Sequence, residues 1–161
     1  LVLPRQSAQA DPATADVGSP DLSLWYTPAE LYRMAETYGP EGRRDYIRAR
    51  FSFDVAWPLV YGAFLVTTIS WLYARAFKTA SAWTLANLAP VLGVLLDLME
   101  NLSTSLVMAR YPERTPGIAA LAPVFTLAKW AFVGGSFVLL LVGVVVAVWT
   151  WGTRTRRPSK G

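Results

Sequence analysis

An apolar stretch of the chain carries acidic and amide side chains one helical turn apart, in the sequence Asp97-Leu98-Met99-Glu100-Asn101. Because Glu100 follows Asp97 by three residues and Asn101 follows it by four, a helix places all three on one face. The opposite face is Leu, Val and Met. A membrane helix with such a polar side must turn it toward protein or water. The same helical spacing extends the polar face to Pro90, Gly93 and Thr104.

Lys129 stands in a second apolar stretch, on a stripe of small or polar residues, and small residues let helices approach closely. In an antiparallel hairpin, residues equidistant from the turn come level. The midpoint between Asp97 and Lys129 is Glu113, inside the connecting turn. We therefore predict that Asp97 and Lys129 meet. The other members of the stripe are Ala122, Thr126, Ser136 and Gly143.

Asp97, Glu100, Asn101, Thr104 and Lys129 are the candidates for a ligand or ion site. If the site is catalytic, Asp97 and Glu100 are the candidate acid and base, because carboxylates can transfer protons without histidine. The chain contains neither Cys nor His. This excludes thiolate nucleophiles, Cys-based metal sites and the usual general base at neutral pH. We expect no metal site and no cofactor.

Two acids and one lysine do not balance in charge. Either one carboxyl group stays protonated, or a further cation completes the balance, with Arg48, Arg50 or a substrate as candidates. A purely structural role is an equal alternative, in which the charges only hold two helices in register.

Long apolar segments must position these residues. The composition is 53% hydrophobic and 16% charged, which is too apolar for a typical soluble domain. Segments 55–74, 84–109 and 118–151 reach the roughly 20 residues needed to cross a hydrocarbon core. We predict an all-α fold, a polytopic transmembrane helix bundle over residues 51–152.

The start of the last span decides the depth of Lys129. If the span begins at Ile118, Lys129 lies about 16 Å deep, and the long helix must tilt or kink, for which Pro123 is the natural place. If residues 131–151 cross the bilayer alone, Lys129 lies at the interface. Both alternatives are open.

Residues 1–24 are expected to be a flexible tail or the remnant of a lost span, because they are rich in Ala, Asp, Pro and Ser. Leu1-Val2-Leu3-Pro4 fits the end of a hydrophobic helix, and Ala8-Gln9-Ala10 fits a signal peptidase site. Both interpretations place the following residues outside the cytoplasm.

Residues 25–50 are predicted to form an amphipathic region at the membrane surface. Thr27-Pro28-Ala29-Glu30 is a capping box, and Gly39-Pro40 ends the helix that it starts. This helix rests on the membrane surface or on the other helices. A second helix from Glu41 is predicted to run straight into the first span, where Arg50 and Asp54 pair.

Aromatic and basic residues mark the expected membrane interfaces, as amphipathic rings and cations do at a head-group boundary. The basic excess, including the C-terminal tail 153–161, predicts contact with lipid head groups and no nucleic-acid partner. The interface residues are Trp57, Trp71, Trp149, Trp151, Arg43, Arg44, Arg48 and Arg50.

Lys and Arg are equally numerous on the two expected faces, so the positive-inside rule does not choose an orientation. The export signals near the N-terminus favour a cytoplasmic C-terminus in a bacterial inner membrane.

Five short motifs lie within residues 25–151: Tyr46-Ile47-Arg48, Phe53-Asp54, Trp57-Pro58-Leu59-Val60-Tyr61, Asp97-Leu98-Met99-Glu100-Asn101 and Phe125-Thr126-Leu127-Ala128-Lys129-Trp130. Their combination resembles small bacterial four-span membrane proteins with an Asp-x-x-Glu-Asn third span, a family to which no activity is assigned. The resemblance implies an architecture alone. It also implies that a first span is lost here, ending at residues 1–4.

Three functions fit these observations. The leading hypothesis is a non-enzymatic bundle, which acts as a subunit of a membrane complex or homo-oligomer or binds a small ligand or ion. The second is a membrane-embedded enzyme acting on a lipid or isoprenoid through a carboxylate. The third is an oligomeric carrier coupled to protons or cations.

Overall fold

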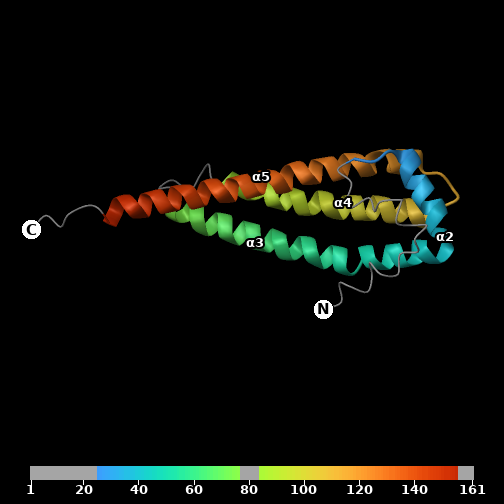
Figure 1. Ribbon diagram of the computed structural model, residues 1–161, viewed down its shortest axis with the longest axis horizontal. Coiled ribbons are helices and arrows are strands. Elements are labelled where there is room, and N and C mark those ends of the chain that lie inside the picture. Colours follow the sequence, from blue (N-terminus) through green and yellow to red (C-terminus); the bar gives the residue numbers. More distant parts are fainter. Residues whose placement is uncertain (1–24, 77–83, 156–161) are drawn as a thin grey trace, which may run out of the picture. The chain divides into compact units, whose positions relative to one another are not determined.

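The computed structural model describes residues 25–76 and 84–155, which form helices and no strand (Figure 1). The elements are α2 (Pro28–Arg50), α3 (Phe53–Ala76), the 3₁₀ turn η2 (Thr84–Asn87), α4 (Leu88–Arg110) and α5 (Pro116–Thr155). The expectations for residues 1–24 and most of the basic tail lie outside the described residues.

Three helical stretches in this described part are long and apolar enough to cross a membrane. The first stretch covers α2 and α3, the second covers most of η2 and all of α4, and the third covers nearly all of α5. The predicted all-α fold and its three apolar helices are therefore confirmed. Large apolar side chains on their surfaces are exposed, including Val138, Leu141 and Val148 at 62%, 63% and 62%. Such surfaces suit a hydrocarbon environment.

The described chain divides into two compact units. Unit 1 consists of the described residues up to Asp54 together with Met99–Leu127. Unit 2 consists of Val55–Leu98, apart from residues 77–83, and the described residues from Ala128 onward. The helices α4 and α5 each contribute one part to unit 1 and one part to unit 2.

The N-terminal helix α2 begins as its sequence predicts. The Thr27 backbone N–H donates to Glu30 Oε2 at 2.6 Å, and the Glu30 N–H donates to Thr27 Oγ1 at 3.2 Å, which completes the capping box. Gly39 adopts φ 63°, ψ −178°, so α2 consists of two helical segments joined at a kink before Pro40. Glycine tolerates this backbone conformation at low cost.

The expected continuous helix from Glu41 into the first span is wrong. The residues Phe51 and Ser52 form a turn between α2 and α3, where the Phe51 N–H donates to Ile47 O and the Ser52 N–H donates to Ala49 O. The first bond has the α-helical spacing of four residues and the second the tighter spacing of three, and together they satisfy carbonyl groups at the end of α2. A second difference is that the predicted segment 84–109 begins with the 3₁₀ turn η2 before the α-helix starts at Leu88.

The core of unit 1 forms where one face of α2 packs on α4 and α5. Leu31, Met34 and Ala35 recur at helical spacing and are buried, which gives α2 a protein-facing side. The sequence left open whether this helix rests on the membrane surface or on the other helices. The buried contacts show that it packs on other helices of the protein. The buried cluster is Tyr26, Leu31, Met34, Ala35, Val107, Met108, Ala119 and Ala122.

The core of unit 2 depends on close contact between helices. Leu65, Ile69, Leu72 and Tyr73 are buried on one side of α3. A Cβ added at Gly62 would lie 2.5 Å from Val94 Cγ2, so the absence of a side chain there allows α3 and α4 to touch.

The last helix is one uninterrupted element of 40 residues that includes Pro123. At about 1.5 Å per residue it is about 60 Å long, about twice the thickness of a hydrocarbon core. The helix begins at Pro116, ahead of both of the expected span starts.

Replacing Gly62 by alanine should destabilise unit 2. The new methyl group would overlap the stiff Val94 side chain, and overpacking of this kind costs about 1 to 3 kcal/mol. Gly134→Ala is the matched control, because nothing lies within 4 Å of the Cβ position at Gly134. Thermal unfolding in detergent, followed by circular dichroism, should show a lower Tm for G62A only. An equal Tm for the two variants would contradict the close contact.

Candidate functional site

The polar face predicted for α4 is the buried face of this helix. Glu100 and Thr104 are fully buried and Asn101 is 2% exposed, whereas Leu95, Met99 and Leu102 on the other side are 43–49% exposed. The stripe predicted on α5 is likewise buried, at Ala122, Thr126, Lys129, Ser136 and Gly143. Both helices therefore turn their polar or small residues toward protein.

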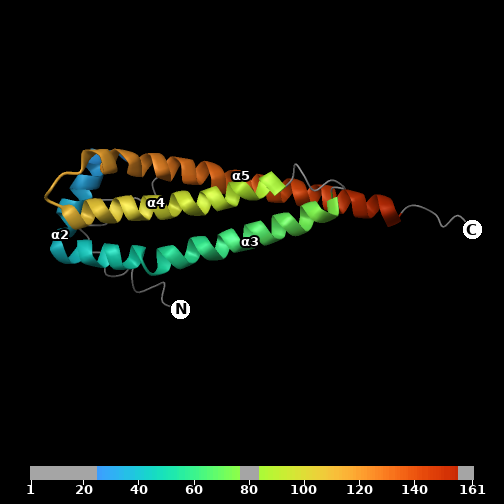
Figure 2. The same cartoon turned by 180° about the vertical axis from the view of Figure 1, so that it is seen from behind.

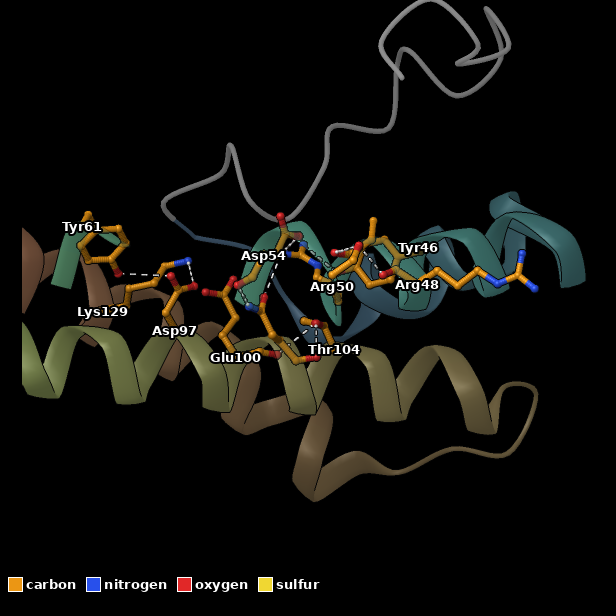
Figure 3. A network of polar contacts seen from close by, with 12 residues as sticks. Tyr46, Arg48, Arg50, Asp54, Tyr61, Asp97, Glu100, Thr104 and Lys129 are labelled. Atoms are coloured by element: carbon orange, nitrogen blue, oxygen red, sulfur yellow. Dashed lines mark hydrogen bonds and ion pairs between the residues drawn. The ribbon is translucent and has the colours of Figure 1, made fainter. Parts of the chain in front are cut away.

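The first polar cluster lies within unit 2 and joins all three of its long helices. Lys129 Nζ on α5 donates to Asp97 Oδ1 on α4 at 3.1 Å, and the Tyr61 hydroxyl on α3 donates to Asp97 Oδ2 at 3.2 Å (Figure 3). The side chains of Lys129 and Asp97 are only 9% and 13% exposed. Both oxygens of the carboxylate thus have donors, and its charge is balanced by the ammonium group.

The ring of Trp130 adds to the surroundings of Lys129. The ammonium nitrogen lies 5.5 Å from the ring centroid, within the range of a cation–π interaction. Such a contact stabilises the positive charge where water is scarce. This cluster can therefore hold an ionised pair in an apolar setting.

The second cluster lies within unit 1, around the buried guanidinium group of Arg50. Its Nη1 donates to Asn101 Oδ1 at 2.9 Å and lies 3.3 Å from Asp54 Oδ2, and its Nη2 donates to the Tyr46 hydroxyl at 2.8 Å. Asn101 Nδ2 donates in turn to the backbone oxygen of Asp54 at 3.0 Å. Figure 3 shows Arg50 between Tyr46 and Asp54. The cluster fixes the end of α2 and the start of α3 to α4.

The burial of Arg50 corrects its prediction as a head-group contact. Its side chain is only 3% exposed, because the planar guanidinium group finds an amide, a phenol and a carboxylate within the protein. Arg48, the other candidate for the missing cation, is 81% exposed and pairs with Asp45 at the surface. Arg50 is therefore the arginine that the structure places among the buried polar residues.

Tyr26 is a further buried polar residue of unit 1. It is 2% exposed, and the Thr126 hydroxyl on α5 donates to its oxygen at 3.3 Å. Burial raises the pKa of Tyr26 well above its usual range, since the phenolate would be poorly solvated there.

Thr104, a predicted site residue, donates to Glu100 O of its own helix at 3.0 Å. Its oxygen lone pairs are left to accept a further bond.

The five predicted site residues fall into two groups. Asp97 and Lys129 come together in unit 2, whereas Glu100, Asn101 and Thr104 lie in unit 1, where Asn101 binds Arg50. The predicted interface tryptophans are 55–73% exposed, as a lipid-facing position requires. They are Trp57, Trp71, Trp149 and Trp151. Arg44 is also exposed, and Arg43 instead donates to Ala35 O and stacks on Tyr111.

Two tyrosines that bind the charged groups were not among the predicted site residues. Tyr46 precedes Arg50 by four residues, a spacing that brings side chains together on a helix and could have indicated the contact. Tyr61 is a hydroxyl-bearing residue in a segment without charges. A hydroxyl group in such a segment could have indicated a hydrogen-bond partner for a charged residue on a neighbouring helix, as Tyr61 is for Asp97.

Comparisons with protein-family models, curated proteins and solved structures find no match for this chain.

The contact between Asp97 and Lys129 can be measured with a double-mutant cycle. Lys129→Met should lower the free energy of unfolding by about 3 kcal/mol, because Asp97 loses its ammonium partner in an apolar setting. The double variant D97N/K129M should recover part of this loss, with a coupling energy of about 1 to 3 kcal/mol. The measurement is unfolding in mixed detergent micelles. Strictly additive losses would show that the pair contributes no direct stabilisation.

Arg50→Lys should destabilise unit 1 although it keeps the charge. An ammonium group cannot reproduce the planar fork that reaches Tyr46, Asn101 and Asp54, so a loss of about 2 kcal/mol is expected. Arg48→Lys is the matched control and should change stability by less than about 0.5 kcal/mol. Unfolding curves for the two variants provide the test. Equal stability would mean that the buried contacts of Arg50 are replaceable.

Proposed function

We propose that this chain is a non-enzymatic multi-pass membrane protein that binds a proton or a small monovalent cation at the carboxyl groups of its buried polar residues. In this proposal it belongs to a bacterial inner membrane, with its C-terminus in the cytoplasm. The ion site includes Glu100, and the polar residues around it maintain the helix arrangement.

The observation that carries the proposal is an excess of acidic side chains. The two polar clusters and Glu100 together contain three carboxyl groups, those of Asp54, Asp97 and Glu100, and two cations, Arg50 and Lys129. One carboxyl group exceeds the cations, and the full burial of Glu100 favours its neutralisation by a bound proton or cation over solvation by water.

A purely structural lock does not need this excess. Paired charges such as Asp97 and Lys129 are sufficient to hold helices in register. An additional acid makes the arrangement less favourable unless something binds to it. The excess therefore supports binding over register alone.

The burial of Glu100 supports a small ligand. Its side chain is fully buried, so a lipid or isoprenoid substrate would reach it only after the helices separate. A proton or a single ion needs a much smaller opening. Within the described residues no three Asp or Glu side chains are grouped closely enough to hold a metal ion, which favours a proton or a monovalent ion over a divalent one.

Infrared spectroscopy of the chain in lipid tests this proposal through the carbonyl band of protonated carboxylic acids. In wild-type protein we expect one such band that responds to pH and weakens when Na⁺ or K⁺ is added at constant pH. Glu100→Gln should remove it. Glu113→Gln is the matched control and should leave the band unchanged, because the Glu113 side chain is 74% exposed.

Two results would overturn the proposal. A band that ignores pH and salt would show that the carboxyl groups are static, and a band that persists in E100Q would assign the binding elsewhere. Circular dichroism of E100Q establishes that its helices are intact. Glu100→Asp serves as a second variant if E100Q does not fold, because it keeps a carboxyl group at this position and should shift the band without removing it.

A further inference from the structure

A groove between α3 and α5 lies within unit 2, where both helices approach their C-terminal ends. It encloses about 650 Å³ and is lined by Trp71, Arg75, Val144, Val148 and Trp151, among other side chains. Figure 2 shows the end of α3 beside the last part of α5. Apolar residues form most of its wall, and Arg75 and Thr150 are its polar side chains.

One end of the groove is closed by close packing of the same two helices. The Tyr73 hydroxyl on α3 donates to Leu139 O on α5 at 3.0 Å. A Cβ added at Gly143 would lie 2.9 Å from Tyr73 Cε2, so the helices touch at this point. Beyond Gly143 the helices leave room between Trp71 and Trp151.

Arg75 is held in position at the groove. Its guanidinium carbon lies 4.0 Å from the ring centroid of Trp71, and its Nη1 donates to Trp71 O at 3.2 Å. Among the described residues no carboxylate forms an ion pair with Arg75. A stacked guanidinium keeps further N–H donors at its edge, and these match the geometry of a phosphate group.

The groove combines the features that a phospholipid requires. Exposed tryptophans at the ends of apolar helices are typical of the head-group level of a bilayer, and Trp71 and Trp151 are 55% and 73% exposed. Val144 and Val148 present an apolar wall toward the hydrocarbon side, while Arg75 supplies a positive charge beside the tryptophans. Basic pockets between membrane helices are suited to anionic head groups.

We propose that this groove binds one anionic phospholipid, with its phosphate on Arg75 and an acyl chain along Val144 and Val148. The lipid completes the surface between α3 and α5. This inference is independent of the proposed ion site, because it uses different residues.

Native mass spectrometry tests this inference with the full chain released from nanodiscs of equal phosphatidylglycerol and phosphatidylcholine content. The wild-type chain should retain phosphatidylglycerol in preference to phosphatidylcholine. Arg75→Gln should lower this preference about fivefold, the effect of one basic residue near an anionic membrane surface. Arg110→Gln removes the same charge outside the groove and should keep the preference.

A second variant tests the cavity itself. Ala147 lines the groove, so Ala147→Phe should fill it and abolish lipid retention without changing the charge. Equal retention of the two lipids by wild-type protein, or equal preference in R75Q and R110Q, would overturn the proposal. A lipid-free dimer that A147F converts to monomer would also overturn it, by showing that a second copy occupies the groove.

Discussion

Polar groups on an apolar helix must find their partners within the protein, and this constraint organises both units. The helix α4 concentrates its polar side chains on one face, and that face is buried. In unit 2 it receives a lysine from α5 and a tyrosine from α3 at Asp97. In unit 1 it receives the arginine that ends α2 through Asn101. These contacts within the protein are needed because the hydrocarbon core of a membrane offers no hydrogen-bond partners to any of these groups.

Periodicity explains how much of the fold could be predicted. Segment lengths and helical spacing are properties of neighbouring residues, so they predict α3, the buried side of α4 and the stripe on α5 from sequence alone. The capping box at Thr27 is also local. The turn at Phe51 and Ser52 carries neither Gly nor Pro, and the one residue there that is common in turns, Ser52, is a weak signal by itself. The continuous helix expected there was therefore wrong.

The site shows the same division between local and distant information. The spacing of Asp97, Glu100 and Asn101 places them on one face, and the hairpin argument brings Lys129 to Asp97. Arginines near a span usually reach the head groups, so the sequence favoured that position for Arg50. Its burial depends on Asn101, which lies 51 positions later in the chain. No local pattern contains that contact.

The ion pair between Asp97 on α4 and Lys129 on α5 has a consequence for biogenesis. When α4 leaves the ribosome it carries Asp97 and Glu100 without Lys129, and isolated acids make a segment a poor substrate for the translocon. The helix α5 is the more apolar of the two and supplies the ammonium group. We therefore expect α4 to enter the bilayer efficiently only once α5 has been synthesised, so that the two insert together as a charge-compensated hairpin.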